Sequence, residues 1–365
     1  MRIAIIHEWL DSYAGSERVL EQMLACFPEA DLYALCDFLP QNQRSFLGGK
    51  VPTTSFIQRV PFARRMFRNY LQLMPLAIEQ FDLQGYDLVL SSSHAVAKGV
   101  ITGPGTRHVS YVHSPMRYAW DLQHQYLRQA GLTRGVKGLY TRWLLGRMRA
   151  WDQASAARPD LILGNSSYIA ERIRKVWRRD ATVLHPPVDL DGFPLGTGQR
   201  THFLVASRQV PYKRVELVAA AFARMPELML TVVGDGPAAP LVARAAAGAP
   251  NITIRGRVPQ PELVALLQTA RAFVFAAEED FGIAMVEAQS CGTPLIVYGR
   301  GGARDIVAEG RTGLFFEAQT PEAIIAAVRD FVSREADFAP QACQAQSRQF
   351  SIAEFRRKLM EITAA

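Results

Sequence analysis

Short hydrophobic runs alternate with stretches of helical periodicity along the whole of this 365-residue sequence. Such runs are typical of strands buried in a parallel sheet, and apolar positions three and four apart are typical of covering helices. The alternation therefore predicts an α/β protein with parallel sheets. The runs predict strands at 3–7, 32–35, 88–91, 107–112 and 161–164, and then at 203–206, 228–233, 252–255, 272–275, 294–297 and 313–316, with helices such as 15–26, 167–176 and 352–365.

A proline-rich break separates the two sets of strands. Two consecutive prolines, Pro186 and Pro187, exclude a helix there. The following segment 194–199 contains Pro and Gly and suits a hinge. A chain of this length normally forms two domains. We therefore predict two Rossmann-like domains, at 1–185 and 186–345.

Composition narrows the class of protein. The chain is 49% hydrophobic and 21% charged, as in globular proteins, and no apolar run reaches the roughly 18 residues of a membrane span. The first residues suggest a buried strand rather than a signal peptide, so we expect a cytoplasmic protein. The four cysteines show no metal-ligand spacing, which favours a reduced interior; they are Cys26, Cys36, Cys291 and Cys343.

Positive charge is concentrated in the first half. Residues 1–185 carry 23 Lys and Arg against 15 Asp and Glu, whereas residues 186–365 carry 18 against 19. Within 41–150 the count is 15 against 4. This asymmetry predicts an anionic partner for the first half, such as a lipid diphosphate or an anionic membrane surface. Nucleic acid is not expected, since no nucleic-acid-binding motif accompanies the charge.

The most specific stretch of the chain places two carboxylates eight positions apart, Glu279 and Glu287, around a Phe-Gly turn. We expect Glu279 in a loop and Glu287 on the second turn of the helix that follows. A helix N-terminus suits a phosphate, and carboxylates accept hydrogen bonds from hydroxyl groups. The pattern predicts a site for a polyol that carries a phosphate.

Two further motifs follow predicted strands of the second half. Arg208 and Lys213 lie five apart on a loop that enters a helix, where two cations would neutralise a diphosphate. The turn at Gly234, followed by Gly236 and Pro237, permits close approach of the backbone.

Together these motifs resemble the Glu-x7-Glu, Arg-x4-Lys and Gly-x-Gly-Pro patterns of retaining glycosyltransferases, in particular glycosyltransferase family 4. The resemblance implies the GT-B fold, in which two Rossmann-like domains face a cleft and the last segment, here 346–365, crosses back to the first domain. This chain departs from the family pattern at Ser207 and Arg214, where the family commonly has Gly.

The resemblance also implies roles for individual residues. Glu287 would bind the ribose, Glu279 the donor sugar, and Arg208 and Lys213 the diphosphate. The remaining contacts to the nucleotide sugar would come from Gly234, Arg257, Val258 and the backbone N–H groups of Phe281, Gly282 and Ile283.

The first half supplies two more candidates. Gly15 opens a predicted helix after the first strand and resembles the family's glycine loop, which meets the distal phosphate, although Ala14 replaces one of the two usual glycines. His113 heads a Ser-Pro-Met-Arg-Tyr-Ala-Trp loop that resembles a segment of bacterial mannosyltransferases of O-antigen and exopolysaccharide assembly. The resemblance implies that His113 orients a sugar hydroxyl or bears on charge at the anomeric carbon.

The implied activity is retaining transfer of α-mannose from GDP-mannose to a lipid-linked or saccharide acceptor, without a metal or cofactor. Asp189 and Asp191 have metal-motif spacing but belong to the proline-rich linker. The alternatives are a transferase that uses a UDP-sugar, a GT-B sugar-nucleotide epimerase, or an inactive binding protein that keeps the fold.

Two basic stretches have the spacing of amphipathic helices, and we expect a helix in each. The first has apolar residues at Phe62, Met66, Tyr70 and Met74 among arginines, and the second runs from Val136 to Trp151. Either these faces pack in the domain core, or they dock peripherally on the anionic inner face of the cytoplasmic membrane.

Overall fold

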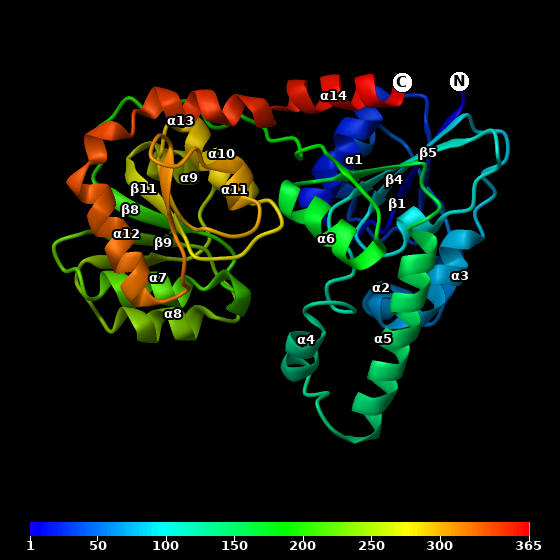
Figure 1. Ribbon diagram of the computed structural model, residues 1–365, viewed down its shortest axis with the longest axis horizontal. Helices are drawn as coiled ribbons and strands as arrows, with labels where there is room; N and C mark the ends of the chain where they lie inside the picture. Colours follow the sequence, from blue (N-terminus) through cyan, green and yellow to red (C-terminus); the bar gives the residue numbers. More distant parts are fainter. Residues whose placement is uncertain (365) are drawn as a thin grey trace. The chain divides into compact units, whose positions relative to one another are not determined.

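The computed structural model describes residues 1–364 and divides into two compact units. Unit 1 comprises Met1–His185 together with the segment from Phe355 onward, and unit 2 comprises Pro186–Glu354. Each unit contains one parallel sheet covered by helices (Figure 1). The predicted α/β class with parallel sheets is therefore confirmed.

The sheet of unit 1 has seven strands in the order β3-β2-β1-β4-β5-β6-β7. Its strands are β1 (Ile3–His7), β2 (Asp31–Ala34), β3 (Thr53–Thr54), β4 (Leu88–Ser93), β5 (Arg107–Val112), β6 (Leu161–Gly164) and β7 (Thr182–Val183). Its helices are α1 (Gly15–Cys26), α2 (Ala63–Met66), α3 (Met74–Glu79), α4 (Gln123–Gln129), α5 (Gly135–Ser155), α6 (Ser167–Trp177) and most of α14 (Ile352–Ala364).

The sheet of unit 2 has six strands in the order β10-β9-β8-β11-β12-β13. Its strands are β8 (His202–Ala206), β9 (Leu230–Val233), β10 (Ile252–Arg255), β11 (Ala270–Phe275), β12 (Leu295–Tyr298) and β13 (Gly313–Phe316). Its helices are α7 (Val215–Phe222), α8 (Ala239–Ala246), α9 (Gln260–Gln268), α10 (Ile283–Ser290), α11 (Ala303–Ile306), α12 (Pro321–Ser333) and α13 (Pro340–Ser347).

The central strands β1, β4 and β5 are buried along nearly their whole length, because both faces of the sheet are covered. In β1, Ala4 and Ile6 pack into one core cluster, whereas Ile5 packs into the cluster on the opposite face. The period of two in strand side chains thus supplies both layers at once. Phe355 and Leu359 of α14 are buried in the same cluster as Ile5.

Both sheets have a topological switch point, where neighbouring strands lead to connections in opposite directions. In unit 1 it lies between β1 and β4, and in unit 2 between β8 and β11. Open parallel sheets bind ligands beyond the carboxyl ends of their strands at such points.

One predicted helix is wrong. The stretch 62–74 is not continuous but consists of α2, a 3-10 segment at Phe67–Leu73 and the start of α3. Phe62 has a left-handed φ of 55° and is 77% exposed, whereas Met74 is 1% exposed. The four-residue spacing therefore does not form one face, because the chain turns between its members.

Three other details differ from the sequence analysis. The two-residue edge strands β3 and β7 were not predicted, since so short a segment carries no periodic signal. Strand β4 continues to Ser93, two residues beyond the prediction. The predicted hinge 194–199 lies within unit 2, which begins at Pro186, and there Gly196 N donates to Cys291 O at 3.1 Å.

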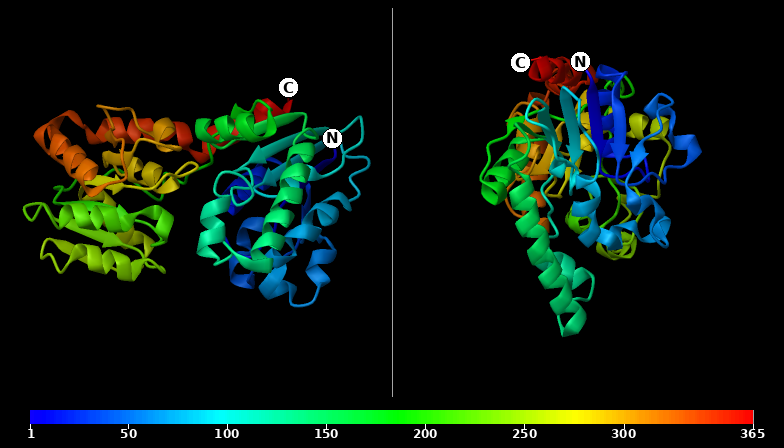
Figure 2. Two further views of the ribbon diagram at one scale, coloured as in Figure 1. Left: turned by 60° about the horizontal axis from the view of Figure 1, so that its bottom comes forward. Right: turned by 90° about the vertical axis from the view of Figure 1, so that its right-hand side faces the viewer.

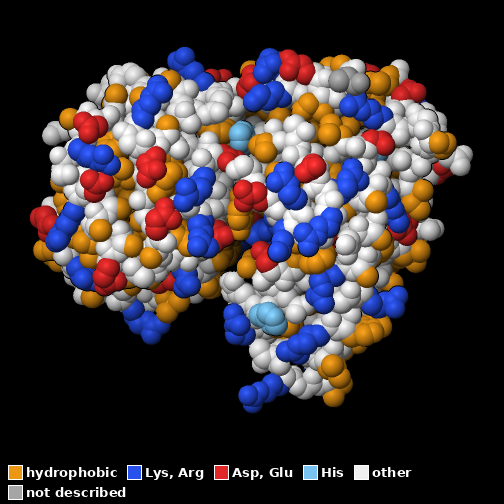
Figure 3. Space-filling view, viewed as in Figure 1, with side chains coloured by type: hydrophobic (Ala, Val, Ile, Leu, Met, Phe, Trp, Pro, Cys, Tyr) orange, Lys and Arg blue, Asp and Glu red, His pale blue; other side chains and the backbone are white. Residues whose placement is uncertain are grey.

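Helix α4 and the N-terminal half of α5 project from the body of unit 1 (Figures 1 and 2). The C-terminal half of α5 packs into the unit through Leu145, Met148 and Asp152. Basic and apolar side chains gather on the projecting part (Figure 3). The 30 residues 122–151 contain six Lys and Arg and no Asp or Glu.

Candidate functional site

A pocket of about 360 Å³ lies at the switch point of unit 2. Loops after β8, β9 and β10 form its walls together with α9 and α10. Its lining residues are Ala206, Ser207, Arg208, Val233, Gly234, Asp235, Arg257, Val258, Leu263, Leu267, Phe273, Ala284 and Glu287. Five predicted site residues thus share one cavity, namely Arg208, Gly234, Arg257, Val258 and Glu287.

The loop that carries Arg208 is fixed by its backbone while the guanidinium stays exposed. Gln209 is buried, its N–H donates to Asp235 O at 2.6 Å, and its side-chain Nε2 donates to Gly234 O at 2.8 Å. Gly234 has a φ of +116°, and a Cβ there would lie 2.0 Å from Ser207 O. Only glycine allows this close approach between the loops after β8 and β9.

Lys213 lies five residues further on, at the end of a 3-10 turn (Pro211–Lys213). Its Nζ forms an ion pair with Glu279 Oε1 at 2.7 Å, and both side chains are largely buried. The ammonium also lies 5.1 Å from the centre of the Phe275 ring. Two predicted site residues from different loops are therefore in direct contact, and the carboxylate holds the ammonium at the carboxyl end of β11.

The loop at Glu279 is held by a glycine pair. Gly302 N donates to Glu279 O at 2.9 Å, and a Cβ on Gly301, whose φ is +72°, would lie 2.2 Å from the same carbonyl oxygen. The chain then enters α10 through Gly282 at a φ of +104°. Glu287 on the second turn is 9% exposed and reaches the pocket.

The N–H groups of Ile283 and Ala284 open α10 and have no carbonyl partner within the helix, whereas Met285 N donates to Gly282 O at 3.0 Å. Gly282 is the residue before the helix, and Phe281 is buried against Phe350, with ring centres 5.4 Å apart. The three successive predicted residues Phe281, Gly282 and Ile283 thus form the N-terminus of α10, where the helix dipole favours an anion.

His113 directly follows β5 in unit 1, at the carboxyl edge of the sheet. Its Nε2 lies 2.9 Å from Ser92 Oγ, and its ring centre lies 6.2 Å from that of His94. Burial, and then the charges of His94 and His7, lower the pKa of His113 to about 3. The imidazole is therefore neutral near pH 7, which suits a hydrogen-bonding group rather than a cation.

Gly15 is the exposed first residue of α1, and Ala14 is the residue before the helix. Ala14 has a φ of −142°, extended backbone that any residue adopts, so the alanine costs nothing at this position. Glu17 Oε2 accepts the Ala14 N–H at 2.9 Å and closes the start of the helix.

Sequence reasoning missed the buried polar residues near His113 and Gly15. His7 ends β1, Glu8 follows it, and Ser92 lies near the end of β4. The Glu8 carboxylate accepts backbone N–H groups from each of residues 94–97. Burial would raise the pKa of Glu8, but the charge of His94 and these backbone hydrogen bonds keep it below its ordinary value. Polar residues at the end of an apolar strand were the available signal.

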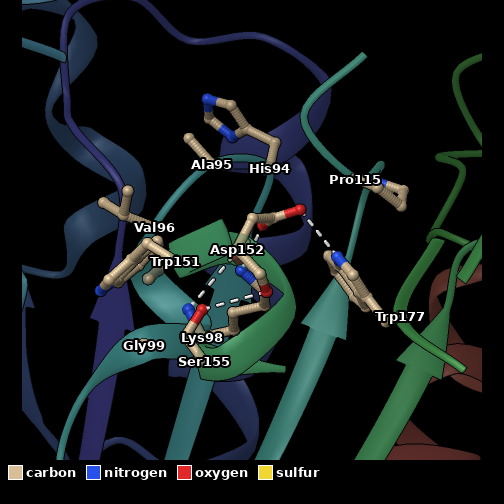
Figure 4. Close-up of polar contacts among 12 residues, drawn as sticks. His94, Ala95, Val96, Lys98, Gly99, Pro115, Trp151, Asp152, Ser155 and Trp177 are labelled. Atoms are coloured by element: carbon tan, nitrogen blue, oxygen red, sulfur yellow. Dashed lines mark hydrogen bonds and ion pairs between the residues drawn. The ribbon is translucent and has the colours of Figure 1, made fainter. Parts of the chain in front are cut away.

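The tryptophan of the predicted histidine loop has a supporting role. Trp120 Nε1 donates to Asp152 Oδ2 at 2.7 Å, as does Trp177 Nε1. The other oxygen of Asp152 pairs with Lys98 Nζ at 2.6 Å (Figure 4). This buried cluster ties the loop after β5 to α5 and α6 and so fixes the loop on which His113 lies.

Across residues 1–364, no group of three or more His, Cys, Asp or Glu side chains is arranged to hold a metal ion. Over the same residues, no helix combines the length and the apolar character needed to cross a bilayer.

Family models match both parts of the chain. The model described as Glycosyltransferase Family 4 matches residues 13–191, and the model described as Glycosyl transferases group 1 matches residues 194–350. Every predicted site residue lies within one of these two ranges.

Among curated proteins, the chain resembles a GDP-mannose-dependent alpha-(1-6)-phosphatidylinositol monomannoside mannosyltransferase of Mycolicibacterium smegmatis, with 27% identity over 56% of this chain and 63% of the relative. It also resembles a D-inositol 3-phosphate glycosyltransferase of Mycobacteroides abscessus, with 28% identity over 63% of this chain and 62% of the relative. The chain thus spans less than two thirds of either relative. Among solved structures, Anabaena HepE in complex with UDP-glucose superposes with a TM-score of 0.69 at 15% identity, covering 100% of both chains.

Proposed function

Because the chain belongs to glycosyltransferase family 4 and has the GT-B fold, we propose that it is a retaining glycosyltransferase. Its proposed reaction moves α-mannose from GDP-mannose to a lipid-linked or saccharide acceptor in surface polysaccharide synthesis. The observation that supports this best is the single pocket shared by Arg208, Gly234, Arg257, Val258 and Glu287.

In the proposed reaction, the bond between the sugar C1 and the β-phosphate oxygen breaks, and a bond from the acceptor oxygen to C1 forms on the same face. The acceptor hydroxyl proton passes to an oxygen of the leaving diphosphate. Arg208 and Lys213 neutralise the charge that develops there, while Glu287 holds the ribose hydroxyls. Glu279 positions Lys213 through their 2.7 Å ion pair and contacts the donor sugar.

The two cations take the place that a divalent metal ion has in other transferases, so we propose that neither a metal nor a cofactor is needed. Turnover should be unchanged after dialysis against EDTA. A loss of turnover that Mg²⁺ or Mn²⁺ restores would contradict this part of the proposal.

GDP-mannose is proposed as donor because the mycobacterial relative is named for it and because the His113 loop resembles that of mannosyltransferases. Thermal unfolding in a panel of GDP-, UDP-, dTDP- and ADP-sugars tests the assignment. A ligand at 100 times its Kd adds about 2.7 kcal/mol to the free energy of unfolding. The largest shift should come from GDP-mannose and should shrink in Glu287→Gln. A larger shift with a UDP-sugar would favour the alternative donor.

An epimerase of the same fold would also bind a nucleotide sugar. It would convert a free UDP-sugar to its epimer with no acceptor present. A transferase releases the nucleoside diphosphate and forms a glycoside only when an acceptor is supplied. Product analysis with and without acceptor therefore separates the two functions.

We further propose that the projecting part of unit 1 contacts an anionic membrane surface that carries the acceptor, on the cytoplasmic face of the inner membrane. Four exposed apolar residues of α5 recur at helical spacing and so share one face. They are Val136, Leu139, Tyr140 and Trp143, which are 84%, 69%, 49% and 55% exposed. The absence of acidic residues over 122–151 gives this apolar face a wholly basic surround. Each basic residue near anionic lipid contributes about 1 kcal/mol.

Co-sedimentation with phosphatidylglycerol–phosphatidylcholine vesicles tests this contact. The pair Leu139→Ser and Trp143→Ser should weaken binding about tenfold or more, since two large apolar side chains no longer enter the interface. The matched control is Met229→Ser with Leu241→Ser, two exposed apolar residues of unit 2. Equal binding by both double variants would contradict the proposed surface.

A further inference from the structure

Three adjacent strands and one helix of unit 1 contribute to a continuous line of hydrogen bonds that ends at His113. Glu17 Oε1 lies 3.2 Å from His7 Nε2, His7 Nδ1 lies 3.1 Å from Ser92 Oγ, and Ser92 Oγ lies 2.9 Å from His113 Nε2. His7 and Ser92 are 0% exposed and Glu17 is 4% exposed. The line crosses the switch point between β1 and β4, where His7 and Ser92 are register partners.

We propose that Glu17, His7 and Ser92 form a positioning chain that determines which ring nitrogen of His113 carries the proton. With one proton on the ring of His7, the chain places the proton of His113 on Nε2 and leaves the Nδ1 lone pair of His113 to accept a hydrogen bond from a sugar hydroxyl. The identity of the sugar partner rests on the proposed function, whereas the proton arrangement does not.

The direction of each hydrogen bond follows from the end at Glu17. Burial would raise the pKa of Glu17, but the hydrogen bond and charge of His7, with N–H and hydroxyl donors at the start of α1, lower it to about 2. An ionised carboxylate only accepts, so His7 Nε2 carries a proton. With one proton on its ring, His7 then has no proton on Nδ1, which accepts the Ser92 hydroxyl proton.

Ser92 has only one proton to donate, and that proton is engaged with His7. Its oxygen must therefore accept the next hydrogen bond, so His113 Nε2 is the protonated nitrogen. A neutral imidazole has one protonated nitrogen, which leaves Nδ1 as an acceptor. Among residues 1–364, none hydrogen-bonds the Nδ1 of His113, so its lone pair is left for a ligand.

The titratable groups that face His113 are His94 from the loop after β4, Tyr111 of β5, and His7 and Glu17 through the chain. The arrangement thus couples the hydrogen-bonding character of His113 to the carboxylate of Glu17 at the other end of the line.

Nitrogen NMR of the full-length protein labelled with ¹⁵N-histidine tests the proposal without any substrate. The His113 signals are assigned by their loss in His113→Gln. Near pH 7, the wild-type protein should show a protonated Nε2 and an unprotonated Nδ1 at His113. Ser92→Ala should give a mixture of both forms, and Glu17→Gln should do so partly, since an amide can donate as well as accept.

The matched control is Ser91→Ala. Ser91 is equally buried on the same strand but faces the other side of the sheet, where its Oγ lies 2.9 Å from His108 Nε2. This variant should leave the His113 signals unchanged while showing that the fold tolerates loss of a buried serine hydroxyl. The proposal is overturned if wild-type His113 carries its proton on Nδ1 near pH 7, or if both Ser92→Ala and Glu17→Gln keep the wild-type form.

A kinetic measurement then connects the chain to turnover. Ser92→Ala should lower kcat/KM about tenfold, whereas Ser91→Ala should leave it unchanged. If the NMR result holds but no mannosyl transfer occurs, the proposed function fails and the positioning chain stands. If transfer occurs with an unchanged kcat/KM in Ser92→Ala, the chain plays no part in turnover and that part of the proposal is wrong.

Discussion

The buried ion pair between Lys98 and Asp152 offers the sharpest test of how unit 1 is held together. Their side chains are 1% and 0% exposed, with Nζ and Oδ1 2.6 Å apart. The change Lys98→Met keeps an unbranched side chain of similar length and removes only the ammonium. It leaves a carboxylate deep in the protein without its cation, so the free energy of unfolding should fall by about 3–5 kcal/mol.

The surroundings support that magnitude. In Lys98→Met, the Asp152 carboxylate would keep two hydrogen bonds, from Trp120 and Trp177, which still offset part of the cost of its burial. However, the ammonium also lies 5.0 Å and 4.8 Å from the ring centres of Trp151 and Trp177. Desolvated contacts of this kind contribute up to about 2 kcal/mol, and methionine makes them only weakly.

Urea unfolding followed by tryptophan fluorescence measures the effect, because three of the five tryptophans lie at this cluster. Lys137→Met on the exposed face of α5 is the control and should stay within about 0.5 kcal/mol of wild type. The double variant Lys98→Met with Asp152→Asn removes both charges and should cost less than the sum of its single changes. A loss under 1 kcal/mol in Lys98→Met, or strict additivity, would refute the reasoning.

Three further outcomes are expected. Lys213→Ala should mainly lower kcat, because the charge on the leaving group peaks in the transition state, and Glu287→Ala should mainly raise the KM for the donor, because the ribose contacts persist throughout the reaction. Steady-state kinetics with wild-type values for both variants would exclude the donor-site assignment. Arg214→Gly should add up to about 1 kcal/mol to the free energy of unfolding, because Arg214 has a left-handed φ of 55° and its ion pair with Glu216 is long, at 3.5 Å. A denaturation curve showing a decrease would contradict the strain argument. Burial lowers the pKa of His108 from 6.5 to about 4, so between those pH values the unfolded chain binds a proton that the folded protein does not. The free energy of unfolding should therefore fall by up to about 1.4 kcal/mol per pH unit on acidification. His108→Gln should reduce this slope in urea titrations at a series of pH values.

The local sequence determined most of the scaffold of this protein. Strands of a parallel sheet are buried on both faces and are therefore rich in apolar residues, so most central strands appear as short hydrophobic runs that can be recognised without knowing their neighbours. The motif residues were also readable, because parallel sheets place their ligand-binding loops directly after such runs. Arg208, Gly234 and Glu287 could therefore be selected from position and residue type.

Regular spacing was misleading where the backbone left its regular path. The residues from Phe62 to Met74 repeat every four positions, yet the left-handed turn at Phe62 places the first in solvent and the last in the core. A two-residue edge strand such as β7 is equally invisible, since it forms only because β6 provides a neighbour.

Only the tertiary structure decided which polar side chains act together. Glu17, His7, Ser92 and His113 come from one helix and from the ends of three strands, separated by up to 85 residues at a single hydrogen bond. Lys98 and Asp152 likewise meet only because α5 packs against the loop after β4. Hydrophobic periodicity records how each segment meets the core as a whole, whereas a hydrogen bond depends on the positions of two particular atoms, which strand order and register determine.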